Sequence, residues 1–253
     1  MSALQTNWDA RAALNFMCGG TGAGLLVATA LTQPAQARWA IVLALALVGS
    51  GLAAVWLELG KPLRALHVFF NPFTSWMARE SLAALALFGL GIAALFEPAL
   101  VFAAAAAAAV FVFCQARMLQ GGKGIPAWRA RETLPLLLAT SLAEGAGLCL
   151  LFATDEVALA LFVTAVLARA LAWSGYCAAV KSPALAAAGR VLLQFGTGAA
   201  LALLIAGALL PQALPLAGLI AAAAGWYLKF ALVTRASLKQ GFALPRLPVR
   251  GAR

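Results

Sequence analysis

The chain consists of long apolar runs separated by short stretches that contain charged residues, proline or glycine. Each run is about 20 residues long, the length of an α-helix that crosses the hydrocarbon core of a bilayer. The runs predict helices over residues 14–33, 39–57, 76–96, 98–117, 134–153, 156–176, 188–209 and 212–234. We therefore expect an all-α polytopic membrane protein, a bundle of eight transmembrane helices that forms a single integral membrane domain over residues 1–253.

The composition excludes a water-soluble domain. Of the 253 residues, 64% are hydrophobic and 10% are charged, and the mean hydropathy is +0.95. A soluble domain carries about 25% charged residues. Small residues in the runs 20–24 (GTGAG) and 101–110 (VFAAAAAAAV) predict close approach between helices rather than a nucleotide-binding loop.

The charged residues are distributed unevenly between the two sides of the predicted bundle. Lys and Arg number 18 against 8 Asp and Glu. With eight spans, Arg38 is the one basic residue assigned to the side that also carries Glu97, Asp155 and Glu156, and the other 17 lie on or nearest the opposite side. The positive-inside rule then places both termini in the cytoplasm, and we expect the chain to lie in a bacterial inner membrane.

Ionisable residues inside predicted spans are costly and are functional candidates by default. Glu58 ends the second span and Glu80 lies four residues into the third, both near the cytoplasmic face. They either pair with a nearby basic residue or act in proton chemistry; the basic candidates are Lys61, Arg64 and Arg79.

Two further ionisable residues lie deeper in the predicted bundle. Glu144 is ten residues into the fifth span and Arg169 is near the inner half of the sixth. We expect either a structural ion pair between them or a proton route. Lys229, near the inner end of the last span, is expected to extend its ammonium group toward the headgroups.

Histidine and cysteine usage argues against a redox centre within this chain. His67 is the single histidine, whereas a membrane dihaem site needs paired axial histidines. The four cysteines are dispersed, without the clustered spacing of iron–sulfur or zinc ligands; they are Cys18, Cys114, Cys149 and Cys177. We expect no haem and no iron–sulfur cluster held by this chain.

Four segments carry a resemblance to a known family. They are residues 57–80 (LELGKPLRALHVFFNPFTSWMARE), 15–24 (NFMCGGTGAG), 125–128 (IPAW), and 225–230 (GWYLKF) through 240–245 (QGFALP). In this order they resemble the membrane anchor subunits of the dimethyl-sulfoxide-reductase type, the DmsC family, which is related to the NrfD family. The resemblance runs almost end to end and includes the count of eight spans.

The resemblance implies a quinone-reactive anchor in a redox complex. Such anchors hold a four-cluster ferredoxin-like iron–sulfur subunit and a molybdopterin catalytic subunit on the membrane, and exchange electrons with menaquinone or ubiquinone. The quinone-site residues of the family carry over to Glu80, and to Glu58 at a position that is often histidine. This departure weakens the assignment of Glu58, because a carboxylate does not donate a hydrogen bond as neutral imidazole does.

The chemistry of the surrounding residues fits this implication. A quinone site needs polar groups for the ring carbonyls and a route for protons, at the edge of an apolar region. Arg79, Ser75 and His67 are expected beside Glu80 at this edge. Trp76 either belongs to the belt of aromatic residues at the membrane interface or offers its flat ring as a contact for the quinone.

The longest predicted cytoplasmic loops, 58–75 and 118–133, are the expected docking surface for the iron–sulfur subunit. The residues expected at this interface are Lys61, Arg64, Lys123, Trp128, Arg129 and Arg131. A cytoplasmic catalytic partner agrees with relatives of the phenylacetyl-CoA:acceptor oxidoreductase type, which residues 241–251 (GFALPRLPVRG) resemble. Two alternatives stay open at this point: a proton-coupled secondary transporter and a scaffold that only anchors its partner.

Overall fold

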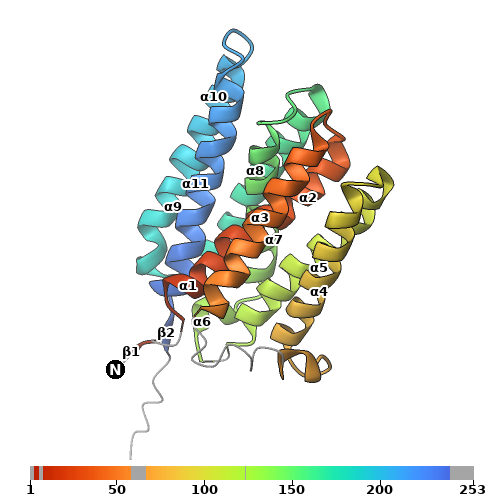
Figure 1. Cartoon of the computed structure of the whole chain (residues 1–253). Coiled ribbons are helices and arrows are strands. Elements are labelled where there is room, and N and C mark those ends of the chain that lie inside the picture. Colours follow the sequence, from red (N-terminus) through yellow and green to blue (C-terminus); the bar gives the residue numbers. More distant parts are fainter. Residues whose placement is uncertain (1–2, 6–7, 58–66, 123, 240–253) are drawn as a thin grey trace, which may run out of the picture.

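The computed structural model describes residues 3–5, 8–57, 67–122 and 124–239, and the account that follows concerns these residues. Helices make up most of the described residues, in a bundle whose axes run roughly along one direction (Figure 1). This confirms an all-helical membrane protein. In the described ranges, seven helices are long and apolar enough to cross a bilayer, and an eighth apolar helix has 17 residues.

The first half of the chain forms four of these helices. Strand β1 (Ala3–Leu4) precedes a continuous helix made of α1 (Ala10–Leu14), the π-helical turn η1 (Asn15–Gly19) and α2 (Gly20–Thr32). Then come α3 (Ala37–Trp56), α4 (Trp76–Ala94), and the short 3₁₀ turn η3 (Pro98–Leu100) that leads into α5 (Val101–Gln120).

The second half adds the other four. A short helix, α6 (Pro126–Arg129), precedes α7 (Thr133–Cys149) and α8 (Glu156–Ala179). The next long helix is composed of η4 (Pro183–Leu185), α9 (Ala186–Leu193), the π-helical segment η5 (Gln194–Ala199) and α10 (Ala200–Ala206). Helix α11 (Ala213–Thr234) and strand β2 (Leu238–Lys239) follow. Each of the eight predicted ranges overlaps one of these long helices.

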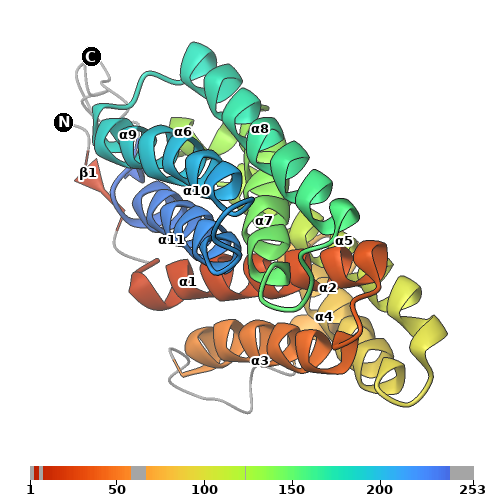
Figure 2. The same ribbon diagram turned by 90° about the horizontal axis from the view of Figure 1, so that it is seen from above.

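Helices α2, α7 and α11 form the centre of the bundle. Helix α7 packs against both α2 and α11, while α8, α9–α10 and α3 lie at the edge (Figure 2). The predicted close approach at residues 20–24 is confirmed at Gly24, where a Cβ atom would overlap the backbone of Ser141 on α7. Gly145 meets the backbone of Gly24 in the same way. Small residues thus bring two helix backbones into direct contact.

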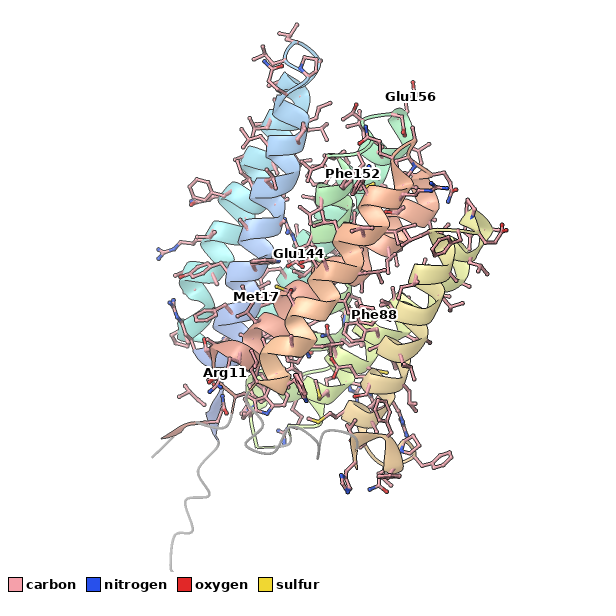
Figure 3. The ribbon with its side chains drawn as sticks, viewed as in Figure 1. Arg11, Met17, Phe88, Glu144, Phe152 and Glu156 are labelled. Atoms are coloured by element: carbon pink, nitrogen blue, oxygen red, sulfur yellow. The ribbon has the colours of Figure 1, made fainter. Side chains whose placement is uncertain are left out.

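The first and last described segments of the chain meet at one end of the bundle. Strands β1 and β2 pair antiparallel, and the backbone N–H of Gln5 donates to the carbonyl of Ser237 at 3.0 Å. The C-terminal end of α3, helix α6 and the turn between α8 and η4 lie at this same end (Figure 1). Glu156, the first residue of α8, and the turn before it, which contains Asp155, lie at the opposite end (Figure 3).

Candidate functional site

The carboxyl group of Glu80 is buried between three helices near the end of the bundle where β1 and β2 lie. Glu80 follows the first residue of α4 by one turn, ~6 Å along the helix, and is 3% exposed. Its Oε1 accepts a hydrogen bond from Nδ2 of Asn15 at 2.9 Å, and Nε2 of Gln115 on α5 donates to the Asn15 backbone carbonyl at 3.1 Å. We call Glu80, Asn15 and Gln115 the Glu80 cluster.

Asn15 occupies the first position of η1, and its other amide atom, Oδ1, is buried without a hydrogen-bond partner in the described structure. A π-helical turn within an α-helix is rare and frequently occurs at functional sites. The unpartnered amide oxygen can accept a hydrogen bond from a ligand hydroxyl, and the neighbouring carboxyl group can accept one as well, or donate one when it is protonated. The Glu80 cluster therefore has the chemistry of a small polar site at the edge of an apolar core.

No basic side chain in the described part of the chain forms an ion pair with Glu80. Arg79 is directed elsewhere: its Nε donates to the carbonyl of Pro72 at 2.8 Å and its Nη2 to that of Phe73 at 2.6 Å. Adjacent helical residues point in different directions, and Arg79 and Glu80 accordingly have separate partners. The alternative of an Arg79–Glu80 pair is wrong, and Lys61 and Arg64 lie outside the described residues.

The other residues expected at a quinone site have separate local roles. The hydroxyl of Ser75 caps α4 by accepting from the backbone N–H of Ala78. The ring of Trp76 lies 4.2 Å from the guanidinium carbon of Arg79 and 5.0 Å from that of Arg117. These are cation–π distances, so the ring already has cationic neighbours.

The other two residues expected to bind quinone, His67 and Glu58, precede α4 in the chain. His67 lies exposed in a turn over residues 67–70, with its ring 5.5 Å from that of Phe70. Glu58 lies outside the described residues. Of the six residues expected to bind quinone, the first turns of α4 therefore hold four: Ser75, Trp76, Arg79 and Glu80.

A second polar cluster lies deeper in the bundle, around Glu144 (Figure 3). Oε2 of Glu144 lies 2.6 Å from Nζ of Lys229, which also donates to the Ser141 hydroxyl at 3.0 Å. The Thr21 hydroxyl lies 2.7 Å from the same carboxylate oxygen and accepts from the Trp226 indole N–H at 2.7 Å. Glu144 and Lys229 are at most 1% exposed. We call these five residues the Glu144 cluster.

The expected pairing of Glu144 with Arg169 is wrong. Arg169 is fully buried, but it donates to two backbone carbonyls, that of Ala221 at 2.7 Å and that of Gly196 at 2.5 Å. Gly196 lies in the π-helical segment η5. The guanidinium group thus binds backbone oxygens between α11 and η5, while Lys229 takes the position beside the carboxylate. The expectation that Lys229 extends to the headgroups is wrong for the same reason.

The two clusters lie on either side of the first long helix. Asn15 belongs to the Glu80 cluster and Thr21 to the Glu144 cluster. At Gly20 a Cβ atom would overlap the Lys229 ammonium and the Ser141 hydroxyl, so a larger residue there would displace these two side chains. The first long helix therefore contributes Asn15 to the Glu80 cluster and Thr21 to the Glu144 cluster, within two helical turns.

Sequence reasoning identified Glu80, Glu144 and Lys229 but missed their hydrogen-bonding neighbours. Asn15 lies at the polar start of the first apolar run, and Ser141 precedes Glu144 by three residues, which places both on one helix face. The three-residue spacing of Ser141 and Glu144 could have indicated that the Ser141 hydroxyl lies near the Glu144 carboxylate. No local pattern in the sequence connects Thr21 and Trp226, which are 205 positions apart.

The residues expected at the partner interface differ in accessibility. Arg129 and Arg131 are exposed at the end of the bundle. Trp128 is 4% exposed, its indole N–H donates to the carbonyl of Leu232 at 2.8 Å, and its ring is 5.0 Å from that of Trp8. Trp128 is therefore a core residue, and its expected role as an apolar anchor for a partner is wrong. Lys61, Arg64 and Lys123 lie outside the described residues.

Searches against protein-family models and against curated proteins find no match to this chain.

Proposed function

We propose that the chain is the quinone-reactive membrane subunit of an oxidoreductase complex, with eight transmembrane spans that include the 17-residue helix α7. In this proposal it attaches a four-cluster iron–sulfur subunit and a molybdopterin catalytic subunit to the cytoplasmic face and passes electrons between them and the quinone pool. The observation that carries the proposal is Glu80, a carboxyl group buried one turn inside a membrane helix, held by Asn15 rather than by a cation.

The chemistry of the Glu80 cluster suits this role. Reduction or oxidation of a quinone moves two protons with two electrons, so a group that takes up and releases a proton beside the ring is required. A carboxyl group without a cationic partner in an apolar environment can exist as the neutral acid at little cost. Glu80 then exchanges protons with the ring, while the unpartnered Oδ1 of Asn15 accepts a hydrogen bond from a quinol hydroxyl.

The exposed basic residues at the same end support a partner surface there. Arg129 and Arg131 are accessible and adjoin the turn that precedes α7. Arginine is enriched at the energetic centres of protein interfaces. In the proposal these residues contact the iron–sulfur subunit, and a terminal cluster of that subunit approaches the Glu80 cluster from the aqueous side. The same proposal places Glu144 and Arg169 on a route by which protons enter the bundle.

The substitution Glu80→Gln tests the proposal, because it keeps the shape of the side chain and removes the proton-accepting oxygen. We expect the complex to assemble and to keep its activity with an artificial dye, while quinone-linked turnover falls at least 100-fold, within the range of general acid–base contributions. Glu97→Gln is the matched control, since Glu97 is exposed in the turn that follows the opposite end of α4 and its substitution should have no effect.

Near-normal quinone turnover in an assembled Glu80→Gln complex would contradict the proton role of Glu80. Loss of assembly would instead assign Glu80 a structural role. An anchor that is only a scaffold predicts that quinone turnover survives the substitution.

One observation favours a second function, proton-coupled secondary transport. The buried Glu144–Lys229 pair lies well inside the bundle, and π-helical turns interrupt two of its helices. Transporters commonly place ion sites where helices are interrupted near the middle of the membrane. A transporter works as a single chain, whereas the proposed subunit needs its partners. Coupled proton uptake by liposomes that contain this chain alone therefore distinguishes the two functions.

A further inference from the structure

A cavity with an aromatic floor lies at the junction of α8 and η4, away from both polar clusters. Its volume is about 230 Å³. The floor is buried and consists of Trp173, Tyr176 and Leu185, with the two aromatic rings stacked 5.7 Å apart. The Tyr176 hydroxyl already donates to the backbone carbonyl of Ala127 at 2.8 Å. The floor is therefore an apolar surface.

The mouth of the cavity is polar and positively charged. Lys181 and Ser182 line it, and Lys181 is exposed. Within the described residues Lys181 forms no ion pair, and the hydroxyl of Ser182 does not cap the helix that begins at Pro183. The sequence has no Asp or Glu after Glu156, so neither of the helices that border the cavity supplies a carboxylate near its mouth. A ligand at this mouth is expected to carry negative charge.

The position of the cavity indicates that this ligand also has an apolar part. Helices α8 and α9–α10 lie at the edge of the bundle (Figure 2), and both expose large apolar side chains, among them Leu171 at 75% and Phe195 at 55%. Such surfaces face lipid in a membrane protein. The rim residue Cys177 is exposed and connects the cavity to this surface. The cavity thus joins an aqueous cationic mouth to a lipid-facing wall.

We propose that this cavity is a binding site for an anionic phospholipid of the leaflet at the end of the bundle where β1 and β2 lie. The phosphate group binds the ammonium of Lys181 and the hydroxyl of Ser182. The glycerol and the first methylene groups lie against the accessible lining residues Cys177, Val180 and Ala186, which cover the buried aromatic floor, and the acyl chains continue along the outer surface of α8. This site is independent of the function proposed for the Glu80 cluster.

Native mass spectrometry of the purified full-length chain tests the site, with phosphatidylglycerol and phosphatidylcholine as probes. One basic residue near an anionic headgroup contributes enough to change affinity about fivefold. We expect Lys181→Gln to weaken phosphatidylglycerol binding about fivefold and to leave phosphatidylcholine binding unchanged. Arg131→Gln is the matched control, because it removes one exposed positive charge from the same end and should leave phosphatidylglycerol binding unchanged.

The thiol of Cys177 provides a second readout, since the other three cysteines are buried. In detergent, phosphatidylglycerol should slow the reaction of Cys177 with a maleimide, and inorganic phosphate at millimolar concentration should not. Equal phosphatidylglycerol affinity of Lys181→Gln and the unmodified chain would overturn the proposal. Protection by inorganic phosphate alone would do the same, because it would identify a site for free phosphate. Equal protection by a short-chain quinone would assign the aromatic floor to a quinone ring instead.

Discussion

Arg79 and Glu80 are adjacent in the sequence, yet their side chains bind different parts of the molecule. Arg79 stabilises the turn before α4 through two backbone carbonyls, and Glu80 enters the bundle to meet Asn15. The helical rotation of ~100° per residue separates the two groups. The Arg79 guanidinium therefore stabilises local structure, while the Glu80 carboxyl group can take part in proton exchange.

Glu144 and Lys229 belong to one unit, so substitution of either residue alone should be more damaging than substitution of both. Glu144→Leu leaves a buried ammonium group and Lys229→Met leaves a buried carboxylate, and each should cost about 3–5 kcal/mol of unfolding free energy. The double variant removes both charges and should be within about 1 kcal/mol of the unmodified protein, since a buried pair is often replaceable by apolar residues. Denaturation in mixed detergent micelles measures these differences.

Glu97→Gln serves again as the control, because it changes an exposed carboxylate and should leave the unfolding free energy within about 0.5 kcal/mol. Additive destabilisation in the double variant would show that the two residues do not form a coupled pair. Near-neutral single variants would show that the charges are already neutralised or hydrated in the bundle.

The sequence allowed the buried acidic residues to be predicted, but not their partners. A charge in the middle of an apolar run is visible from a short window. Which residue pairs with the buried charge depends on how the helices pack, because the two partners can be far apart in the sequence. Glu144 and Lys229 are 85 positions apart. Arg169 was an equally reasonable partner for Glu144 by depth alone. The difference is that α11 presents Lys229 to α7, whereas the Arg169 side chain is bound by carbonyls of Ala221 and Gly196.

At the scale of the element, the helices follow closely from the sequence. The predicted range 76–96 compares with Trp76–Ala94, and 212–234 with Ala213–Thr234. Apolar composition over about 20 residues is sufficient for this result. The π-helical turns η1 and η5 were not predictable in the same way, because one extra residue per turn changes hydrogen bonding without changing composition.

The contact between Gly24 and Gly145 predicts a clear difference among glycine substitutions. Gly145→Ala introduces a methyl group against the backbone of α2 and should destabilise the protein by about 1–3 kcal/mol, the cost of overpacking. Gly89→Ala is the matched control, because a Cβ atom there has no neighbour within 4 Å. This substitution should be neutral or stabilise α4 by up to about 1 kcal/mol. Thermal unfolding in detergent measures both effects.

If Gly145→Ala and Gly89→Ala have equal stability, the backbones of α2 and α7 do not approach as closely as described. The comparison isolates packing from helix propensity, since the same chemical change is made in the interior of two helices. Only the first of them has a backbone against the added methyl group.

At the scale of the whole molecule, the basic and acidic residues named above lie at opposite ends of the helical bundle. Strands β1 and β2 lie at one end of the bundle together with Arg129 and Arg131, and the turns that contain Glu97 and Asp155 lie at the other. This division was available from the sequence, because alternate loops of a helical bundle lie at the same end. The assignment of an end to a compartment rests on the positive-inside rule.

Reporter fusions in a bacterial host test that assignment. A cytoplasmic reporter joined after residue 253 should be active, and a reporter that functions only in the periplasm should be active when it is joined after Glu97. The physical reason is the concentration of lysine and arginine at the first end. The reverse pattern of activity would invert the topology and would move the proposed partner surface to the opposite compartment.

The pairing of β1 with β2 has a consequence for the order in which the molecule is completed. Gln5 and Ser237, which hydrogen-bond beside the two strands, are separated by 232 positions. The ribosome releases the first strand long before the second exists, and closing so distant a contact carries a high entropic cost until the helices between are in place. The small sheet can therefore form only after α11 has been inserted. The β1–β2 pair is therefore the last of these contacts to form, and a chain in which the two strands are paired already has its helices assembled.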